Sequence, residues 1–189
     1  YANNTIVIVF SDHGWQLGEK EHWQKHALWE NLIKSVLMIK VPDGLLSESA
    51  INRKGSDSYR NVSLIDIFPT LTELSSLPAK KGVMGQSLVP LLENPNDQTW
   101  NYPIISTLND NHFSIRKENW HYILYNGEEE ELYDLEKDPE EWRNLAGKSE
   151  YAEVIQELKQ HIPSERKAFV KTKPIRWAEV LSGETKFYE

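Results

Sequence analysis

The stretch TIVIVFSDHGWQLGEKEHWQKHALWE, residues 5–30, joins a β-branched and aromatic run to a dense group of polar and titratable side chains. Residues 5–10 (TIVIVF) are typical of a strand covered on both faces, as in the parallel sheet of an α/β protein. Ligands of such sheets bind beyond the carboxyl ends of the strands. Because residues 11–14 (SDHG) follow the strand directly, we expect a functional site there.

Downstream, the apolar pattern predicts a second strand and a helix. Residues 36–41 have the composition of a strand. Residues 62–75 carry apolar side chains at helical spacing, with Ser63 and Asp66 three apart, as in a capping box. Pro69 must kink this helix or force a later start.

The pattern changes character after residues 93–98 (ENPNDQ), the best boundary candidate in the chain. Short alternating runs follow, and Asn126-Gly127 between the last two is a strong hairpin signal. The sequence therefore predicts an antiparallel meander. Its strands are expected at residues 104–107, 112–117, 120–125 and 130–134.

Helices are expected after the meander. The sequence Asp-Pro-Glu-Glu at 138–141 supplies an N-cap, an N1 proline and an N3 carboxylate for a short helix. Residues 152–162 place apolar side chains on one face of another helix. The predicted fold class is α/β, with residues 1–98 forming part of a mostly parallel core and residues 99–189 a smaller subdomain with an antiparallel sheet, helices and a tail.

Some side chains of the meander are assigned to structure rather than to ligand binding. Residues 128–131 (EEEE) are expected at a solvated hairpin end, because exposed carboxylates need no ligand. Aromatic residues are expected to form the apolar face of the meander rather than a sugar platform. They are Trp120, Tyr122, Tyr125, Tyr133 and Trp142.

Charge and composition exclude several classes of function. A formal net charge of -8 argues against nucleic-acid binding, so an anionic ligand must be held by local positive charge. No apolar run is long enough for a membrane span. The chain has no cysteine, which excludes disulfides and Cys-ligated metals. It opens at Tyr1 rather than at methionine, so we expect natural sequence upstream.

Each group of titratable residues has a functional and a structural interpretation. Asp12 and His13 could ligate a divalent cation, since carboxylate oxygen suits calcium or magnesium and imidazole suits zinc, but Asp-His-Gly also forms ordinary turns. His22 and His26 have the spacing of a helical zinc pair, yet no glutamate follows His22 as a general base, which favours surface histidines. Lys25 is either a fixed cation for an anionic substrate or a solvated lysine.

The complete string Ser-Asp-His-Gly-Trp-x-Leu-Gly-Glu, followed by Trp-Gln-Lys at 23–25, resembles the sulfatases of the alkaline-phosphatase superfamily, most closely the iduronate-2-sulfatase-like branch. The resemblance extends to about Ala146 and is to the C-terminal portion of such enzymes. Further matching segments stand in order: residues 62–70 (VSLIDIFPT), 85–88 (GQSL), 131–135 (ELYDL), 138–140 (DPE) and 144–146 (NLA).

The resemblance implies specific roles for four residues. Asp12 and His13 would bind a calcium ion. Lys25 would be a catalytic residue that contacts the substrate sulfate, and Trp15 would line the sugar subsite. A calcium ion and a lysine together can neutralise the oxygens of a sulfate ester and the charge that moves to the leaving oxygen.

The family's nucleophile is a formylglycine made from the Cys or Ser of a Cys/Ser-x-Pro-x-Arg motif, which lies upstream of this strand. Two further aspartate ligands, an arginine and a histidine acid also lie there in the family. The near match at 76–80 (SLPAK) falls at a helix end and is interpreted as a chance similarity to the nucleophile motif. Since calcium needs roughly five or six ligands, we expect the isolated chain to be inactive and nearly metal-free.

The resemblance implies that the full-length protein hydrolyses sulfate esters, on a sulfated sugar or glycosaminoglycan fragment. Its partners would be that carbohydrate and the missing N-terminal part of the same protein. The family implies a periplasmic, secreted or lysosomal location. Two alternatives stay open: a zinc-dependent phosphatase or phosphodiesterase of the same superfamily, and a non-catalytic carbohydrate-binding fragment.

Overall fold

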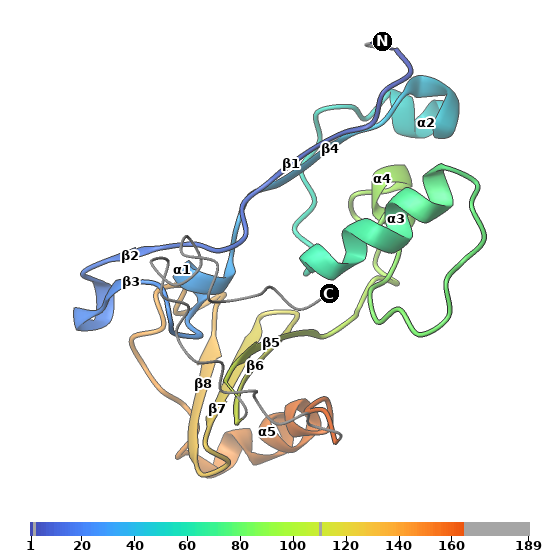
Figure 1. The fold of residues 1–189 in the computed structure, drawn as a ribbon. Coiled ribbons are helices and arrows are strands. Elements are labelled where there is room, and N and C mark those ends of the chain that lie inside the picture. Colours follow the sequence, from blue (N-terminus) through green and yellow to red (C-terminus); the bar gives the residue numbers. More distant parts are fainter. Residues whose placement is uncertain (2, 110, 165–189) are drawn as a thin grey trace, which may run out of the picture.

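A computed structural model describes residues 1, 3–109 and 111–164 of the chain (Figure 1). No helix in these ranges is both long and apolar enough to cross a membrane. The elements are β1 (Val7–Phe10), β2 (Gln16–Leu17), β3 (Trp23–Gln24), α1 (Glu30–Ile33), β4 (Leu37–Lys40), α2 (Glu48–Ile51), α3 (Ile67–Leu74), α4 (Val89–Glu93), β5 (Ile104–Leu108), β6 (His112–Lys117), β7 (Trp120–Tyr125), β8 (Glu129–Asp134) and α5 (Ala152–Lys159). Short 3₁₀ helices span Glu19–Glu21, Asp43–Leu45, Leu64–Asp66 and Ser149–Tyr151.

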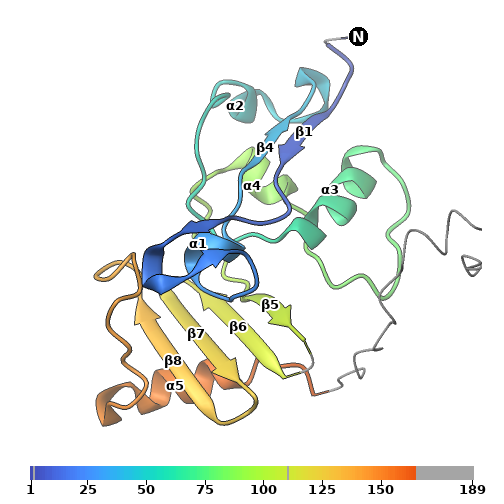
Figure 2. The same cartoon turned by 60° about the vertical axis from the view of Figure 1, so that its left-hand side comes forward.

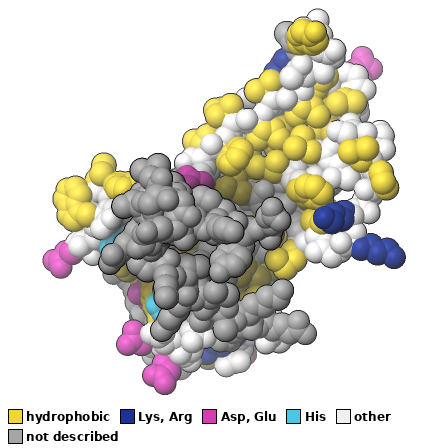
Figure 3. Space-filling view, viewed as in Figure 1, with side chains coloured by type: hydrophobic (Ala, Val, Ile, Leu, Met, Phe, Trp, Pro, Cys, Tyr) yellow, Lys and Arg dark blue, Asp and Glu magenta, His cyan; other side chains and the backbone are white. Residues whose placement is uncertain are grey.

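β1 and β4 form an antiparallel ribbon, with Val7 opposite Lys40 and Phe10 opposite Leu37. Both strands occur where the sequence predicts them, but no parallel pair forms within the described ranges. The ribbon is also less covered than expected, since Val7, Val9 and Phe10 are 44%, 49% and 53% exposed. Figure 3 shows hydrophobic side chains along this ribbon and over α3. Within the described part of the chain, the ribbon therefore keeps an open apolar surface.

The four-stranded sheet, in the order β5-β6-β7-β8, is the meander that the sequence predicts. β6 and β7 have the predicted bounds, and β5 and β8 are each one residue longer. Asn126 (φ 51°) and Gly127 (φ 82°) form the turn between β7 and β8. Both lie in the left-handed region that a type I′ hairpin turn requires. The hairpin signal is therefore confirmed.

One face of this sheet is covered by α5 (Figure 2). Phe113, Tyr122 and Leu132 pack there in a buried cluster with Ile155 and Leu158 of the helix. The amphipathic helix predicted around residues 152–162 is confirmed as α5. The predicted tail falls on residues outside the described ranges, and the division at 98/99 stays a prediction.

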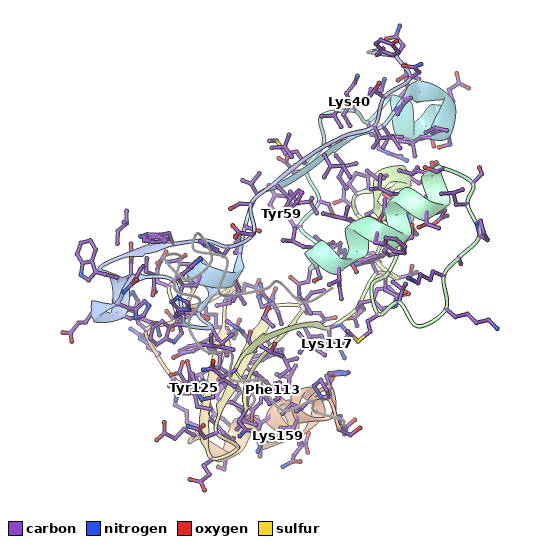
Figure 4. All side chains as sticks on the ribbon, in the orientation of Figure 1. Lys40, Tyr59, Phe113, Lys117, Tyr125 and Lys159 are labelled. Carbon is purple, nitrogen blue, oxygen red and sulfur yellow. The ribbon has the colours of Figure 1, made fainter. Side chains whose placement is uncertain are left out.

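α1 and the loop before it cover part of the opposite face of the sheet. Leu28 is buried against Ile123 and Tyr133, which alternate with the residues that face α5. Tyr125 packs on the same side, and Figure 4 shows Tyr125 and Phe113 on opposite sides of the sheet. Residues 28–33 therefore pack on the C-terminal sheet.

α3 begins with the predicted capping interaction, in which the Ser63 N–H donates to Asp66 Oδ2 at 2.7 Å. A 3₁₀ turn precedes the α-helix, so Pro69 lies in the first turn of α3. Backbone N–H groups in the first turn have no acceptor within the helix, so the N–H that proline lacks costs no hydrogen bond. Asp66 is buried, and its second carboxylate oxygen accepts the Gln86 N–H at 2.8 Å. Burial raises the pKa of Asp66.

The short helix predicted at residues 138–141 is wrong. These residues form a turn in which the Asp138 carboxylate accepts the N–H groups of Trp142 (3.1 Å) and Arg143 (2.7 Å). Glu141 has a φ of 58°, which ends any helix, and its side chain is buried. Trp142 is 64% exposed, so it does not join the buried aromatic side chains of the sheet.

Candidate functional site

The chain leaves β1 through a tightly held turn. The Ser11 hydroxyl donates to the His13 carbonyl at 2.9 Å, and the Gly14 N–H donates to the Leu32 carbonyl at 2.7 Å. A Cβ on Gly14 would lie 2.0 Å from the Asn31 carbonyl oxygen, so only glycine allows this approach. The glycine of the motif thus packs the end of β1 against α1.

This turn brings all four predicted site residues together. Lys25 Nζ lies 3.1 Å from His13 Nε2, and His13 Nε2 lies 3.6 Å from Asp12 Oδ2. The ring centroids of His13 and Trp15 are 6.2 Å apart. The Asp12 side chain is 80% exposed and that of His13 is 31% exposed. The group is therefore open to a ligand.

The tautomer of His13 follows from its neighbours. Its Nδ1 lies 2.7 Å from the Gly14 carbonyl oxygen, which can only accept, so Nδ1 carries the proton. Nε2 then offers a lone pair to the Lys25 ammonium. The same lone pair is the one that an imidazole uses to bind a metal ion.

The loop that carries Lys25 has a strained backbone. Lys20, Glu21, Gln24 and His26 have φ values of 52°, 56°, 75° and 81°. Non-glycine residues in this region cost on the order of 1–3 kcal/mol each and persist only where their surroundings hold them. Such strain is concentrated at functional sites.

Contacts with β8 hold this loop. Lys20 Nζ donates to the Tyr133 hydroxyl at 3.2 Å and lies 4.9 Å from the centroid of the Trp29 ring. Glu131 Oε2 accepts from Trp29 Nε1 at 2.9 Å and from the Tyr133 hydroxyl at 2.8 Å. Burial lowers the pKa of Lys20. Glu131 is therefore a structural acceptor and not the solvated hairpin carboxylate that we expected.

A buried polar network holds the N-terminus of α1. Glu141 Oε2 accepts the Glu30 N–H at 2.8 Å, and Glu141 Oε1 accepts from His121 Nδ1. His121 Nε2 lies 2.6 Å from the Ser114 hydroxyl. Arg116 Nε donates to the Glu30 carboxylate at 3.2 Å. The side chains of Ser114, His121 and Glu141 are all almost fully buried, which marks the network as structural.

Sequence reasoning missed the contacts of Lys20, Trp29 and the Glu30 N–H because their partners lie 102 to 113 residues away in the chain. The helical zinc pair also fails, since His22 and His26 flank β3 and a left-handed turn rather than a helix. The His22 ring packs edge-on against Trp29, and its Nε2 lies 3.2 Å from the Lys25 carbonyl oxygen. Across the described residues, no group of three or more His, Cys, Asp or Glu side chains could hold a metal ion.

A cleft of about 610 Å³ lies beside this loop, on the face of the sheet away from α5. This volume is within the range of roughly 300–1,000 Å³ that ligand sites occupy. It is lined by His22, His26, Ala27, Trp29, Leu108, Asn109, His112, Tyr125, Glu129, Glu130, Glu131 and Asn144.

Comparison with known proteins identifies the family. The model of the N-sulphoglucosamine sulphohydrolase C-terminal domain matches residues 18–168. The chain belongs to the sulfatase family. A sulfatase of Formosa agariphila is 36% identical over 163 residues, which are 86% of this chain and 30% of that protein. The match to the C-terminal portion of a sulfatase is thereby confirmed, whereas the iduronate-2-sulfatase-like branch stays a prediction.

Solved structures confirm the fold class. A protein in complex with its substrate D-glucosamine-2-N,6-O-disulfate superposes with a TM-score of 0.69 at 28% identity, over 84% of this sulfatase chain and 33% of the other. The phosphonate monoester hydrolase of Agrobacterium radiobacter gives a TM-score of 0.66 at 27% identity, over 82% of this chain and 33% of that one. The chain spans about a third of the length of the relatives it matches.

Proposed function

We propose that the protein containing this chain hydrolyses sulfate esters of sulfated sugars, glycosaminoglycan fragments included. The observation that carries the proposal is the position of Lys25 Nζ, 3.1 Å from His13 Nε2 and beside Asp12, at the carboxyl end of β1 in a sulfatase chain. The nucleophile would be a formylglycine in sequence upstream of residue 1.

The exposed cluster has the chemistry that a sulfate site needs. The Lys25 ammonium is a donor for sulfate oxygens in a chain whose net charge is -8. The Asp12 carboxylate supplies oxygen ligands of the kind that Ca²⁺ prefers, and the resemblance to sulfatases implies His13, next to it in the chain, as a second ligand. When bound, calcium would supply positive charge that stabilises the sulfate oxygens during ester cleavage. Trp15, 52% exposed beside His13, would line the sugar subsite.

The exposed apolar side chains of β1 and β4 support the proposal that further protein packs against this ribbon. Val9, Phe10 and Met38 are each about half exposed in the described part of the chain, an arrangement that favours burial by further protein. The isolated chain offers two candidate metal ligands and does not contain the proposed nucleophile, so its catalytic machinery is incomplete. We therefore propose that the isolated chain releases no sulfate.

Similarity to a phosphonate monoester hydrolase favours a second candidate, ester hydrolysis at phosphorus with zinc in place of calcium. The imidazole of His13 suits zinc as a ligand. The two candidates differ in whether a sulfate or a phosphate ester is the better substrate. A non-catalytic fragment that binds sulfated glycans is the third, and it predicts glycan binding by the isolated chain.

The test uses the natural full-length protein with 4-nitrophenyl sulfate and 4-nitrophenyl phosphate as substrates. We expect Lys25→Ala to lower kcat/KM for the sulfate by about 100-fold or more, since a charged donor to the developing anion is lost. Lys81→Ala, in the exposed loop between α3 and α4, is the matched control and should stay within about twofold of the parent.

Further arms separate the candidates. Asp12→Ala should also abolish sulfate release and lower the calcium content measured by elemental analysis. Parental activity in Lys25→Ala, or faster hydrolysis of the phosphate ester, would refute the sulfatase proposal. The isolated chain, assayed in parallel, should show no turnover.

A further inference from the structure

The cleft beside the Lys25 loop differs from the sulfate site in its position and its charge. Lys25 precedes His26 in the chain, yet Lys25 does not line the cleft, because its ammonium contacts His13 instead. One wall is the segment from His22 to Trp29, and the other is the exposed end of the sheet. The cleft and Lys25 therefore share the segment from His22 to Trp29, but the Lys25 ammonium is directed to His13.

Several polar groups of the cleft are already engaged by the protein. Glu131 accepts from Trp29 and Tyr133, and Glu130 forms an ion pair with Lys159. The Asn144 side chain bonds the backbone on both sides. These contacts shape the cleft and leave little hydrogen-bonding capacity for a ligand.

Other groups of the cleft have capacity to spare. Within the described part of the chain, the side chains of His26, Asn109 and Glu129 make no hydrogen bond or ion pair. Glu129 is exposed at the start of β8, and Asn109 follows β5. Hydroxyl and amine groups are natural partners for an imidazole, an amide and a carboxylate.

The charge of the lining selects between sugars. Glu129 and Glu131 contribute carboxylates, Glu130 is paired with Lys159, and no lysine or arginine is among the described residues that line the cleft. Burial raises the pKa of Tyr125 in the same wall, and the carboxylates of Glu131, Glu141 and Glu129 add to this effect. A uronate or a second sulfate would be repelled here, whereas an uncharged or amine-bearing sugar would not.

We propose that this cleft is a second carbohydrate subsite, which takes an uncharged or amine-bearing sugar residue joined to the sulfated one. Trp29 and Tyr125 supply apolar walls, His26 and Asn109 bond ring hydroxyls, and Glu129 receives the amine. The inference rests on the proposed sulfatase function, and it names which sulfated saccharides the enzyme prefers.

The experiment compares substrates on the full-length protein. Three sulfated disaccharides carry the same sulfated residue joined to glucosamine, glucose or glucuronate, and 4-nitrophenyl sulfate, which has no second sugar, is the reference. We expect kcat/KM relative to this reference to be about tenfold higher for the glucosamine and glucose compounds than for the glucuronate compound.

A charge-neutral variant tests the role of Glu129 directly. Glu129→Gln should lower the relative kcat/KM for the glucosamine compound by about fivefold or more, through KM, and leave the glucose compound closer to the parent. Glu128→Gln is the matched control, because Glu128 is exposed next to it and does not line the cleft. It should leave all ratios within about twofold of the parent.

Each outcome decides between the proposals. Equal or faster hydrolysis of the glucuronate compound, or unchanged ratios in Glu129→Gln, overturns the subsite while the sulfatase function stands. An equal loss of activity on 4-nitrophenyl sulfate in Glu129→Gln overturns it as well, because that substrate does not reach the cleft. Absence of sulfate release from every substrate refutes the proposed function itself.

Discussion

At the scale of single residues, the site depends on one close backbone approach. Gly14 N–H donates to the Leu32 carbonyl, and the α-carbon of Gly14 lies against the backbone of α1. The sequence motif contains a glycine there because no side chain fits between the end of β1 and this helix. The proximity of Asp12, His13 and Lys25 could be predicted from the sequence since they lie within one short segment, and their roles stay predictions.

Gly14→Ala should destabilise the protein. The added Cβ would meet the Asn31 carbonyl oxygen at 2.0 Å and the Lys34 carbonyl oxygen at 2.9 Å, and relieving such overlap costs about 1–3 kcal/mol or more of unfolding free energy. Gly44→Ala is the control, because its Cβ meets nothing within 4 Å. Urea unfolding of the full-length protein measures both. Equal stabilities would show that the turn has room to relax.

At the scale of elements, local sequence patterns predict the strands and turns of the C-terminal sheet, but they do not predict how more distant segments pair or pack. The bounds of β6 and β7 and the turn at Asn126-Gly127 follow from alternation and from turn chemistry, which act over a few residues. The antiparallel pairing of β1 with β4 could not be predicted, because an apolar run does not specify its partner's direction.

The error at residues 138–141 has a long-range cause. Asp-Pro-Glu-Glu is a good helix start by local rules, yet the Glu141 carboxylate bonds the backbone of α1 and the imidazole of His121. These tertiary bonds hold Glu141 at a φ of 58°, against its local preference. The anchors of the Lys25 loop could not be predicted for the same reason.

Glu141→Gln should weaken the attachment of α1 to the sheet. The amide NH₂ would face either the Glu30 N–H or His121 Nδ1–H, both of which are donors, and a buried mismatch of this kind costs about 1–3 kcal/mol. Glu140→Gln, one residue earlier and exposed, should stay within about 0.5 kcal/mol of the parent. The free energy of unfolding of the full-length variants decides, and equal values would mean that the network contributes nothing.

At the scale of the whole molecule, the chain corresponds to about a third of the length of its sulfatase relatives. Its relatives are about three times as long, and the ribbon of β1 and β4 keeps apolar side chains exposed in the described residues. Further protein that packs on the ribbon would explain why β1 has the apolar sequence of a covered strand although its side chains are about half exposed in the described residues.

Val9→Lys tests whether the remainder of the protein covers the ribbon. If it does, the lysine must be buried without a partner, and the full-length protein should lose about 2 kcal/mol or more of unfolding free energy. Met84→Lys is the control, since Met84 is 84% exposed in a loop and should change stability by about 0.5 kcal/mol at most. If Val9→Lys is equally mild, this strand faces solvent in the full-length protein.

The attachment of the Lys25 loop to the C-terminal sheet bears on how sulfatases can be recombined. Hydrogen bonds join Lys20 to Tyr133, Trp29 to Glu131, and Glu30 to Glu141. The Lys25 loop and the sheet therefore depend on each other although they lie far apart in the sequence. A chimera joined near residue 98 would pair one enzyme's lysine loop with another enzyme's anchors. Chimeras that exchange residues 18–33 together with the sheet keep these bonds, and they are the grafts that should transfer sugar preference intact.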